Sequence, residues 1–181
     1  TRITETGISR DHTERMLKAF SYPLEREGDT LILNSLEECK AARIDVPGDI
    51  SSAAFFIVAA TIIAGAHIVI KNVGFNPTRT GIISILRTMG ANIQESNTRF
   101  VGDEPIVDLE IKHAKLKGIT IDEALVPLAI DEFPAIFIAA ACASGTTILR
   151  GAHELRVKES DRIGAMVEGL NQLGIAAQAL E

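Results

Sequence analysis

Eight residues from Arg156 to Ile163, RVKESDRI, contain five charged side chains, three cations and two anions. If Ser160 or Asp161 caps a helix here, Arg162 lies in the first helical turn and Lys158 lies just before it. The positive end of a helix dipole repels such cations and attracts anions. A bound oxyanion would remove this conflict, because it could accept hydrogen bonds from the first-turn N–H groups, from a guanidinium and from an ammonium. The run therefore predicts an anion-binding site.

A second interpretation of the same run needs no ligand. Glu159 and Asp161 could neutralise Lys158 and Arg162 at a solvated helix start, with about 0 to 1 kcal/mol of stabilisation for each pair. The physical chemistry of this run favours neither interpretation over the other.

The composition narrows the class of protein. Of 181 residues, 46% are hydrophobic and only 4% are aromatic, so the core must consist mainly of Ile, Leu, Val and Ala, as is usual in α/β folds. A net charge of −6 argues against a nucleic-acid partner, which requires a broad basic surface. Cys39 and Cys142 are far apart and have no His or Cys at metal-ligand spacing, so we expect buried free thiols and a cytoplasmic location.

An uncharged stretch runs from Ile50 to Ile70, ISSAAFFIVAATIIAGAHIVI, and is long enough to suggest a membrane span. Gly65 interrupts it, and the β-branched HIVI that follows favours a buried helix and then a buried strand. We therefore expect no membrane partner. No signal peptide is visible at the start of the chain. The chain begins without Met and ends within a strand-like pattern, so we expect a piece of a longer protein.

Three segments share one pattern: SRDHTERMLKAFSYPLE from Ser9, TRTGIISILRTMGANIQ from Thr78, and SDRIGAMVEGLNQLGIAAQ from Ser160. Each opens with a hydroxyl residue and an Arg, and apolar residues then recur at helical spacing. In two of the three, Gly90 or Gly174 follows the last apolar position, as at a helix C-terminus, and an alternating strand pattern comes next. The repeated unit is a helix that leads into a strand.

A second similarity links SSAAFFIVAATIIAGAHIVIKNV with DEFPAIFIAAACASGTTILRGA, each predicting an apolar helix, a glycine and a strand. Joined, the two patterns predict an α/β fold with two repeated units between Asp49 and Glu181, and with further strands at 106–111 and 118–121. Residues 1–46 contain only the last part of a third copy. The segment DVPGDISS, which starts at Asp45, has an adjacent Pro and Gly between this partial copy and the first full unit. We therefore expect one domain in residues 1–46 and another in residues 47–181. A plain turn before a capped helix explains this segment equally well.

Five stretches together resemble a known family, the 5-enolpyruvylshikimate-3-phosphate synthases. They are SRDHTERML, PGDISSAAFF, NPTRTG, IDEFPAIFIAAA and LRVKESDRI, in the family's order and at suitable intervals. The resemblance covers essentially the whole chain and is closest to the bacterial glyphosate-tolerant branch, in which SRDHTE and IDE(F/Y)P are typical. It implies two domains of three βαβαββ units, with mixed parallel and antiparallel sheets around buried helices. This chain would be a central segment that lacks part of the active site.

The resemblance implies transfer of the enolpyruvyl group of phosphoenolpyruvate to the 5-hydroxyl of shikimate 3-phosphate, with release of phosphate and with no metal or organic cofactor. The reaction belongs to the biosynthesis of chorismate and aromatic amino acids. It needs a base for the attacking hydroxyl, an acid for the methylene carbon, and cations for the phosphate and carboxylate charges. The implied partners are these two substrates and the remainder of the same enzyme, which would be a monomer at full length.

The resemblance also assigns roles to individual residues. Asp131 matches the aspartate that contacts the ring hydroxyls and acts as base, and Glu159 matches the carboxyl group that delivers the proton. Arg10 and Lys158 match positions that bind shikimate 3-phosphate, and Arg162 matches an arginine that binds phosphoenolpyruvate. From its position alone, Asp131 could instead simply cap the helix that follows it.

Three further residues receive no definite role from the resemblance. Arg79 is the Arg at the start of the second repeated segment. It matches no ligand-binding residue of the family, so we regard it as structural. Ser9 is a weaker candidate for the phosphate, and Glu154 stands where some members of the family have an Asn near the substrate.

Two alternative functions remain open. The first is the sister enolpyruvyl transferase that acts on UDP-N-acetylglucosamine, although that family lacks the KESDR cluster. The second is a non-catalytic module that binds anions or a partner domain through the same charges.

Overall fold

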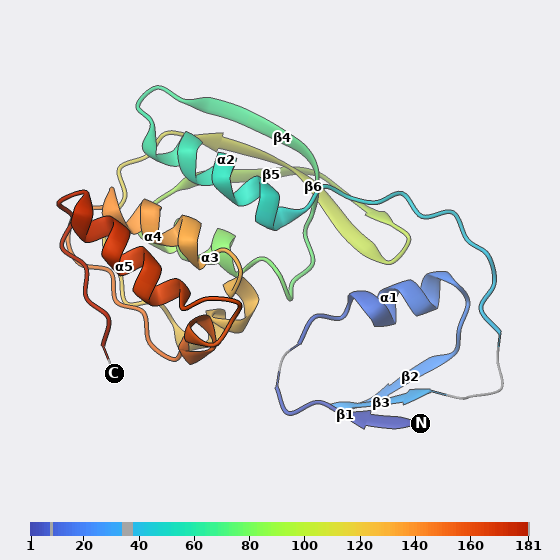
Figure 1. Ribbon diagram of the computed structural model, residues 1–181. Helices are drawn as coiled ribbons and strands as arrows, with labels where there is room; N and C mark the ends of the chain where they lie inside the picture. The colour runs from blue at the N-terminus through green and yellow to red at the C-terminus, as the bar shows by residue number, and fades with distance from the viewer. Residues whose placement is uncertain (8, 34–37, 181) are drawn as a thin grey trace.

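A computed structural model describes residues 1–7, 9–33 and 38–180 of the chain (Figure 1). The N-terminal part contains one helix and a small sheet. Its elements are β1 (Arg2–Thr4), α1 (His12–Ala19), β2 (Leu24–Glu27) and β3 (Thr30–Leu33). The strands pair antiparallel in the order β1-β3-β2, and α1 packs next to β2.

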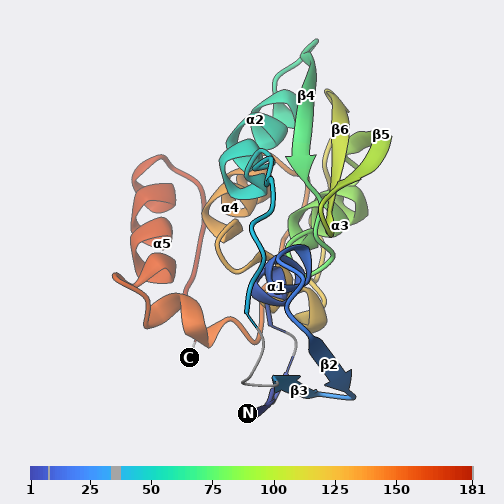
Figure 2. The same ribbon diagram turned by 90° about the vertical axis from the view of Figure 1, so that its right-hand side faces the viewer.

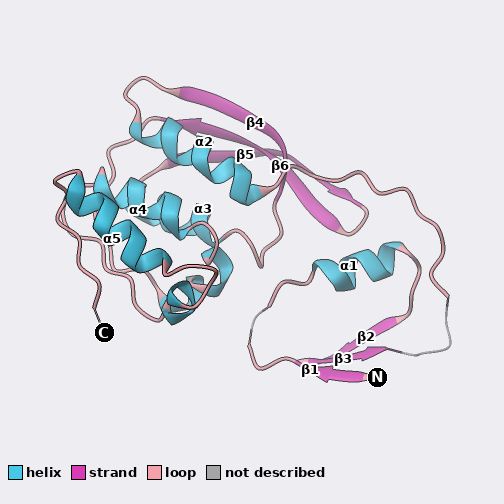
Figure 3. Cartoon of the chain, viewed as in Figure 1, coloured by secondary structure: helices cyan, strands magenta, loops and turns pink. Residues whose placement is uncertain are grey.

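The rest of the chain forms a second sheet with helices on one side of it (Figure 3). Its main elements are α2 (Ile50–Ile62), β4 (His67–Gly74), α3 (Gly81–Met89), β5 (Asn92–Val101), β6 (Glu104–Lys112), α4 (Phe133–Ala141) and α5 (Arg162–Gln172). Three short 3-10 turns are η1 (Glu123–Leu125), η2 (Pro127–Ala129) and η3 (His153–Arg156). The strand order is β4-β6-β5, again antiparallel. The α/β class is therefore confirmed.

The predicted helix boundaries follow from local chemistry. The carboxylate of Asp49 accepts hydrogen bonds from the first-turn N–H groups of Ser51 at 3.2 Å and Ser52 at 2.9 Å, which begins α2. Gly90 ends α3 with φ of 104°, a left-handed conformation that glycine adopts without strain. These contacts explain why the helices begin and end where the sequence pattern predicts.

One apolar core joins the second sheet to its helices. Helix α4 lies between α2 and α5 in both views (Figure 1, Figure 2), and α2, α3 and β6 close the other sides of the core. The large side chains without solvent exposure include Ile57, Ile82, Leu86, Leu109, Ile111, Phe133 and Ile136. Burial on this scale contributes about 25 cal/mol for each Å² of apolar surface removed from water, so this core fixes the helices that carry the site.

Several predicted strands do not form in the described residues. Strand β6 confirms the one at 106–111. The segments at 118–121 and at 146–150, the strand expected after Gly145, make only the isolated parallel bridge Thr120–Ile148, and Lys117–Ser144 forms another just before them. Residues 175–180 form no strand either. The named strands of both sheets pair antiparallel, so the expected mixture of pairings is reduced to isolated parallel bridges in the part of the chain described. A strand requires a hydrogen-bonded ladder along its length, and these segments have at most one rung.

Three predictions about burial were wrong. The strand expected to be buried after Gly65 is β4, in which only Val73 is buried and Val69 is 52% exposed. Helix α2 was expected to be buried, yet Phe55 and Phe56 are 67% and 65% exposed because only its opposite side packs on α4 and the sheet. Cys39 and Cys142 are free as expected but exposed. Cys142 follows the last turn of α4, and Cys39 lies in the link between the two parts of the chain, so neither thiol reaches the core.

The two parts of the chain meet where α1 faces the β5–β6 hairpin. Arg15 donates to the carbonyl oxygen of Asp103 at 2.7 Å, and His12 Nδ1 lies 2.6 Å from Glu104 Oε1. The buried amide of Asn76 donates to Asp11 at 2.6 Å. The SRDH and NPTRTG motifs therefore contact each other, although more than sixty residues separate them.

Candidate active site

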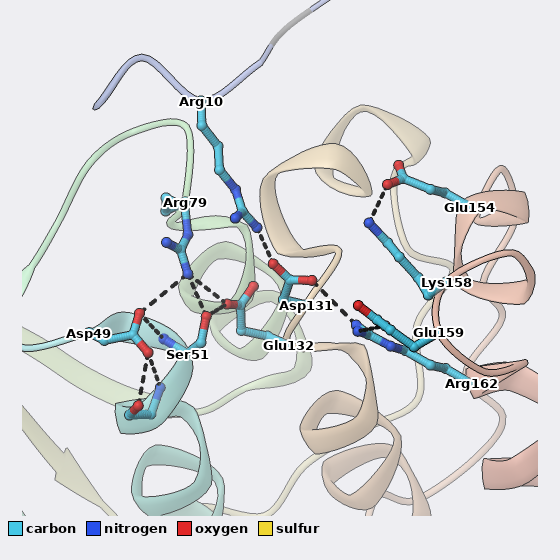
Figure 4. A network of polar contacts seen from close by, with 11 residues as sticks. Arg10, Asp49, Ser51, Arg79, Asp131, Glu132, Glu154, Lys158, Glu159 and Arg162 are labelled. Carbon is cyan, nitrogen blue, oxygen red and sulfur yellow. Dashed lines mark hydrogen bonds and ion pairs between the residues drawn. The ribbon is translucent and has the colours of Figure 1, made fainter. Parts of the chain in front are cut away.

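Asp131 lies in the turn between η2 and α4, at the meeting point of three segments (Figure 4). Its carboxylate accepts a hydrogen bond from Arg10, which comes from the segment before α1. It also lies 3.3 Å from Nη1 of Arg162, the first residue of α5. The chain thus brings together an acid and two cations that are distant in sequence.

These cations determine the ionisation of Asp131. Burial by itself would raise the pKa of this carboxyl, but the hydrogen bonds and positive charges of Arg10 and Arg162, with Lys158 nearby, outweigh it. The pKa of Asp131 is therefore held below its ordinary value of 3.8. Asp131 is an anion at neutral pH in this arrangement.

Helix α5 begins as one of the two predicted caps requires. The carboxylate of Asp161 accepts the N–H of Gly164 at 2.9 Å, so Arg162 is the first helical residue. The guanidinium of Arg162 reaches back to Glu159 at 3.0 Å. Hydrogen bonds from its own backbone N–H and from Arg162 hold the pKa of the exposed Glu159 carboxyl below its ordinary value.

Lys158 faces a different carboxylate. Its ammonium forms an ion pair with Glu154, one turn earlier in the chain. Arg156 Nη1 lies 3.5 Å from Asp161 Oδ2, so each cation of the charged run has an anionic partner within the chain. The ligand-free interpretation expected such pairing in part, although it did not name Asp131 or Glu154 as partners. We call Arg10, Asp131, Lys158, Glu159 and Arg162 the exposed charge cluster.

A second group of polar residues lies directly behind Asp131 and was missed by the sequence interpretation. The hydroxyl of Ser51 donates to the carboxylate of Glu132, and the guanidinium of Arg79 donates to Ser51. Arg79 Nη2 also lies 3.6 Å from Glu132 Oε1 and 3.4 Å from Asp49 Oδ1. We call Ser51, Arg79 and Glu132 the buried network.

The two adjacent acids differ in ionisation. Burial raises the pKa of Glu132 above its ordinary value, and the bond from Ser51 and the charge of Arg79 only partly oppose this. Two signals in the sequence could have indicated the network: the Glu directly after Asp131, and the Arg near the start of each repeated segment.

A pocket of about 180 Å³ opens between the first turns of α2 and α4, beside both acids. Its walls are formed by Ser51, Ser52, Ala54, Phe55, Asp131, Glu132, Pro134 and Ala135. A larger cavity of about 360 Å³ lies between α1 and the β5–β6 hairpin, and its walls include Asp11, Arg15 and Asp103 but no member of the exposed charge cluster. Of the exposed charge cluster, only Asp131 lines the smaller pocket, and the other four members lie outside its walls.

Comparison with known proteins decides the family. The family model described as EPSP synthase (3-phosphoshikimate 1-carboxyvinyltransferase) matches residues 1–181, the whole chain. The chain belongs to the EPSP synthase family. A 3-phosphoshikimate 1-carboxyvinyltransferase from Legionella pneumophila (strain Philadelphia 1) is 61% identical over 181 residues, which are all of this chain and 42% of that protein. One from Alkalilimnicola ehrlichii is 57% identical over 178 residues, or 98% of this chain and 40% of that protein.

The solved structures agree with this family. An EPSP synthase from Acinetobacter baumannii superposes with a TM-score of 0.90 and 56% identity, over 94% of this chain and 39% of that one. This member of the EPSP synthase family thus spans about two fifths of the length of the relatives it matches.

Two further features concern the described part of this EPSP synthase family member. Among residues 1–7, 9–33 and 38–180, no group of three or more His, Cys, Asp or Glu is arranged to hold a metal ion. None of the helices described is long and apolar enough to cross a membrane.

Proposed function

We propose that this chain supplies part of the active site of a 3-phosphoshikimate 1-carboxyvinyltransferase, the enzyme that transfers an enolpyruvyl group from phosphoenolpyruvate to shikimate 3-phosphate. The observation that carries the proposal is the position of Asp131 between Arg10 and Arg162. Because the chain spans 42% of its Legionella relative, we assign the activity to an enzyme of full length. The chain by itself should be inactive.

Three cations are proposed to bind the substrates. Arg10 and Lys158 would hold shikimate 3-phosphate, and Arg162 would hold phosphoenolpyruvate. Their side chains are 42%, 25% and 25% exposed, so an anion from solvent can reach them. A phosphate or carboxylate oxygen would replace the carboxylates that now pair with them, and charge-assisted bonds of this kind are among the stronger ones in proteins.

Two acids are proposed to move protons. Asp131 would remove the proton of the 5-hydroxyl as the hydroxyl oxygen bonds to C2 of phosphoenolpyruvate, while Glu159 in its protonated form would protonate the methylene carbon. Breaking the C2–O bond to phosphate and removing a proton from the new methyl group would then restore the double bond. When the phosphate of shikimate 3-phosphate pairs with Arg10 in place of Asp131, the pKa of Asp131 should rise, which makes Asp131 a better base.

The division into domains at residues 46 and 47 is also part of this proposal. It is supported by the sheets, since β1 to β3 lie within residues 2–33 and β4 to β6 lie within residues 67–112. Residues 8, 34–37 and 181 of these domains lie outside the described residues. A monomeric enzyme in the cytoplasm remains our prediction.

The test is calorimetry followed by a transferase assay. The chain should be titrated with shikimate 3-phosphate, alone and then mixed with the complementary segments of the Legionella relative. We expect weak or no heat from the chain alone, and binding together with phosphate release once the segments are combined. Arg162→Ala should weaken phosphoenolpyruvate binding, and Lys158→Ala should weaken shikimate 3-phosphate binding.

Arg87→Ala is the matched control, because Arg87 is an exposed arginine on α3 whose partners are Glu95 and the carbonyl oxygen of Ile93, outside both groups. It should change neither titration. If the combined segments fold but bind neither substrate, and if Lys158→Ala and Arg162→Ala behave like the control, the chain is a non-catalytic module. Heat with UDP-N-acetylglucosamine instead would indicate the sister transferase.

A further inference from the structure

Glu132 occupies a helix-capping position without capping the helix. It is the N-cap of α4, where a carboxylate usually accepts an N–H from the first turn. Its side chain makes no such bond, and Pro134, in that first turn, has no N–H to offer. Instead the Glu132 side chain is turned inward and is only 1% exposed. A buried carboxyl that does not cap its own helix must be stabilised by other partners, and its burial suggests a different task.

The partners of Glu132 come from two other motifs. Ser51, in the first turn of α2, donates its hydroxyl to Glu132. Arg79, two residues before α3, contacts both Ser51 and Glu132. The side chain of Arg79 is only 16% exposed, so water competes weakly for these contacts. The network therefore ties the turn of Asp131 and Glu132 to the starts of α2 and α3.

Backbone packing strengthens the same connection. A Cβ atom added to Gly81 would lie 2.7 Å from the carbonyl carbon of Leu128 and 2.9 Å from Cβ of Ala129. The start of α3 thus touches η2, the turn just before Asp131, with no space between them. This contact is independent of the side chains in the buried network.

Figure 4 shows how the two acids are oriented. Glu132 points toward Ser51 and Arg79, while Asp131 points toward Arg10 and Arg162. Because the two residues share a peptide bond, holding Glu132 in the core limits where the carboxylate of Asp131 can lie. A catalytic group misplaced by about 1 Å can lose on the order of 100-fold in rate.

We propose that Ser51, Arg79 and Glu132 are positioning residues, which hold the backbone of Asp131 so that its carboxylate reaches the substrate hydroxyl. This inference rests on the proposed function. It assigns a role to Arg79, which the family resemblance left structural, and to Glu132, which received no role from the sequence.

The test uses an enzyme of full length that carries this sequence. We expect Glu132→Ala to lower kcat by about 10- to 100-fold, with KM for both substrates within about 3-fold, because positioning affects the reacting group rather than binding. Glu132→Gln should retain most of the kcat, since its amide oxygen still accepts the Ser51 hydroxyl. Arg79→Ala combined with Glu132→Ala should be little worse than the stronger single variant, as expected for residues that act as a unit.

Ser51→Ala removes only one hydroxyl and keeps the test valid if Glu132→Ala does not fold. It should lower kcat by about 3- to 10-fold with KM unchanged. Arg87→Ala is again the control and should leave kcat unchanged. If the parent enzyme is active and all folded variants of the network have the kcat of this control, the inference alone is overturned. An equal loss of kcat in Glu132→Gln and Glu132→Ala would overturn it too. An inactive parent would instead overturn the proposed function.

Discussion

Asp131 and Glu132 are neighbours in sequence but have opposite surroundings. The side chain of Asp131 is 30% exposed and pairs with two arginines from distant segments, whereas that of Glu132 is 1% exposed and lies within the buried network. Partners at the surface can be exchanged for the anionic groups of a substrate. Partners in the interior cannot, because an unpaired buried charge is costly. Asp131 therefore belongs to a surface that can bind a substrate, and Glu132 belongs to the interior that holds this surface in place.

The pKa directions follow the same division. Cations lower the pKa of Asp131 in spite of partial burial, and burial raises the pKa of Glu132 in spite of a nearby cation. Adjacent acids whose environments separate their pKa values commonly have different tasks in an active site. Four predictions would break or sharpen this distinction, and they follow from the largest expected effect to the smallest.

Replacing the exposed acid should cost the most activity. In an enzyme of full length, Asp131→Asn should lower kcat by about 100- to 10,000-fold, the usual contribution of a general base. Asp122→Asn is the control, because Asp122 is an exposed cap of η1 outside both groups. A steady-state assay that finds Asp131→Asn as active as this control would remove Asp131 from the proposed chemistry.

Adding a methyl group to Gly81, where α3 packs against η2, should affect the stability of the fold. Gly81→Ala should lower the free energy of unfolding by about 1 to 3 kcal/mol, the usual cost of overpacking, because its Cβ would meet Leu128. Gly169→Ala should instead raise it by about 0.5 to 1 kcal/mol, because nothing lies within 4 Å of that Cβ and alanine favours helices. Urea unfolding of both variants measures this. Equal effects would mean that α3 does not press on η2.

The dependence of stability on pH should differ in sign between the two acids. The raised pKa of Glu132 adds stability below its ordinary value of 4.5, and this is lost as pH rises through the folded value. Relative to the parent, Glu132→Gln should therefore gain stability as pH rises above 4.5. The lowered pKa of Asp131 has the reverse effect.

Stability from Asp131 is present above its ordinary value of 3.8 and is lost as pH falls through the folded value. The advantage of the parent over Asp131→Asn should therefore shrink only below pH 3.8. Urea unfolding across this range measures both differences. Curves of the same sign for the two variants would contradict the division between exposed and buried acids.

The smallest effect concerns the exchangeable partner of Lys158. Glu154→Gln should strengthen shikimate 3-phosphate binding by no more than about 5-fold, because it frees an ammonium from an exposed pair worth about 0 to 1 kcal/mol. Calorimetry on an enzyme of full length measures this change. Glu95→Gln, which removes the ion pair of the remote Arg87, should leave this binding unchanged. Weaker binding in Glu154→Gln would show that Glu154 itself contacts the substrate.

Helix ends and part of the site could be predicted because their causes are local or tied to motifs. Asp49 and Asp161 cap helices within three residues of themselves, and Gly90 ends one through its own backbone. The family motifs indicated Asp131 and Arg162, and the structure brings these two together. Strands at 118–121 and 146–150 were predicted wrongly, because apolar alternation does not reveal whether two segments pair along their whole length.

The sequence by itself determined the α/β class, the helices with their caps, and the family, since all of these depend on residue type and short spacing. Only the tertiary structure decided which charges meet. Arg10 and Asp131 are 121 residues apart, and Ser51 and Glu132 are 81 apart. Their contacts, and therefore which carboxyl is exposed and which is buried, exist only once the core closes and places these segments side by side.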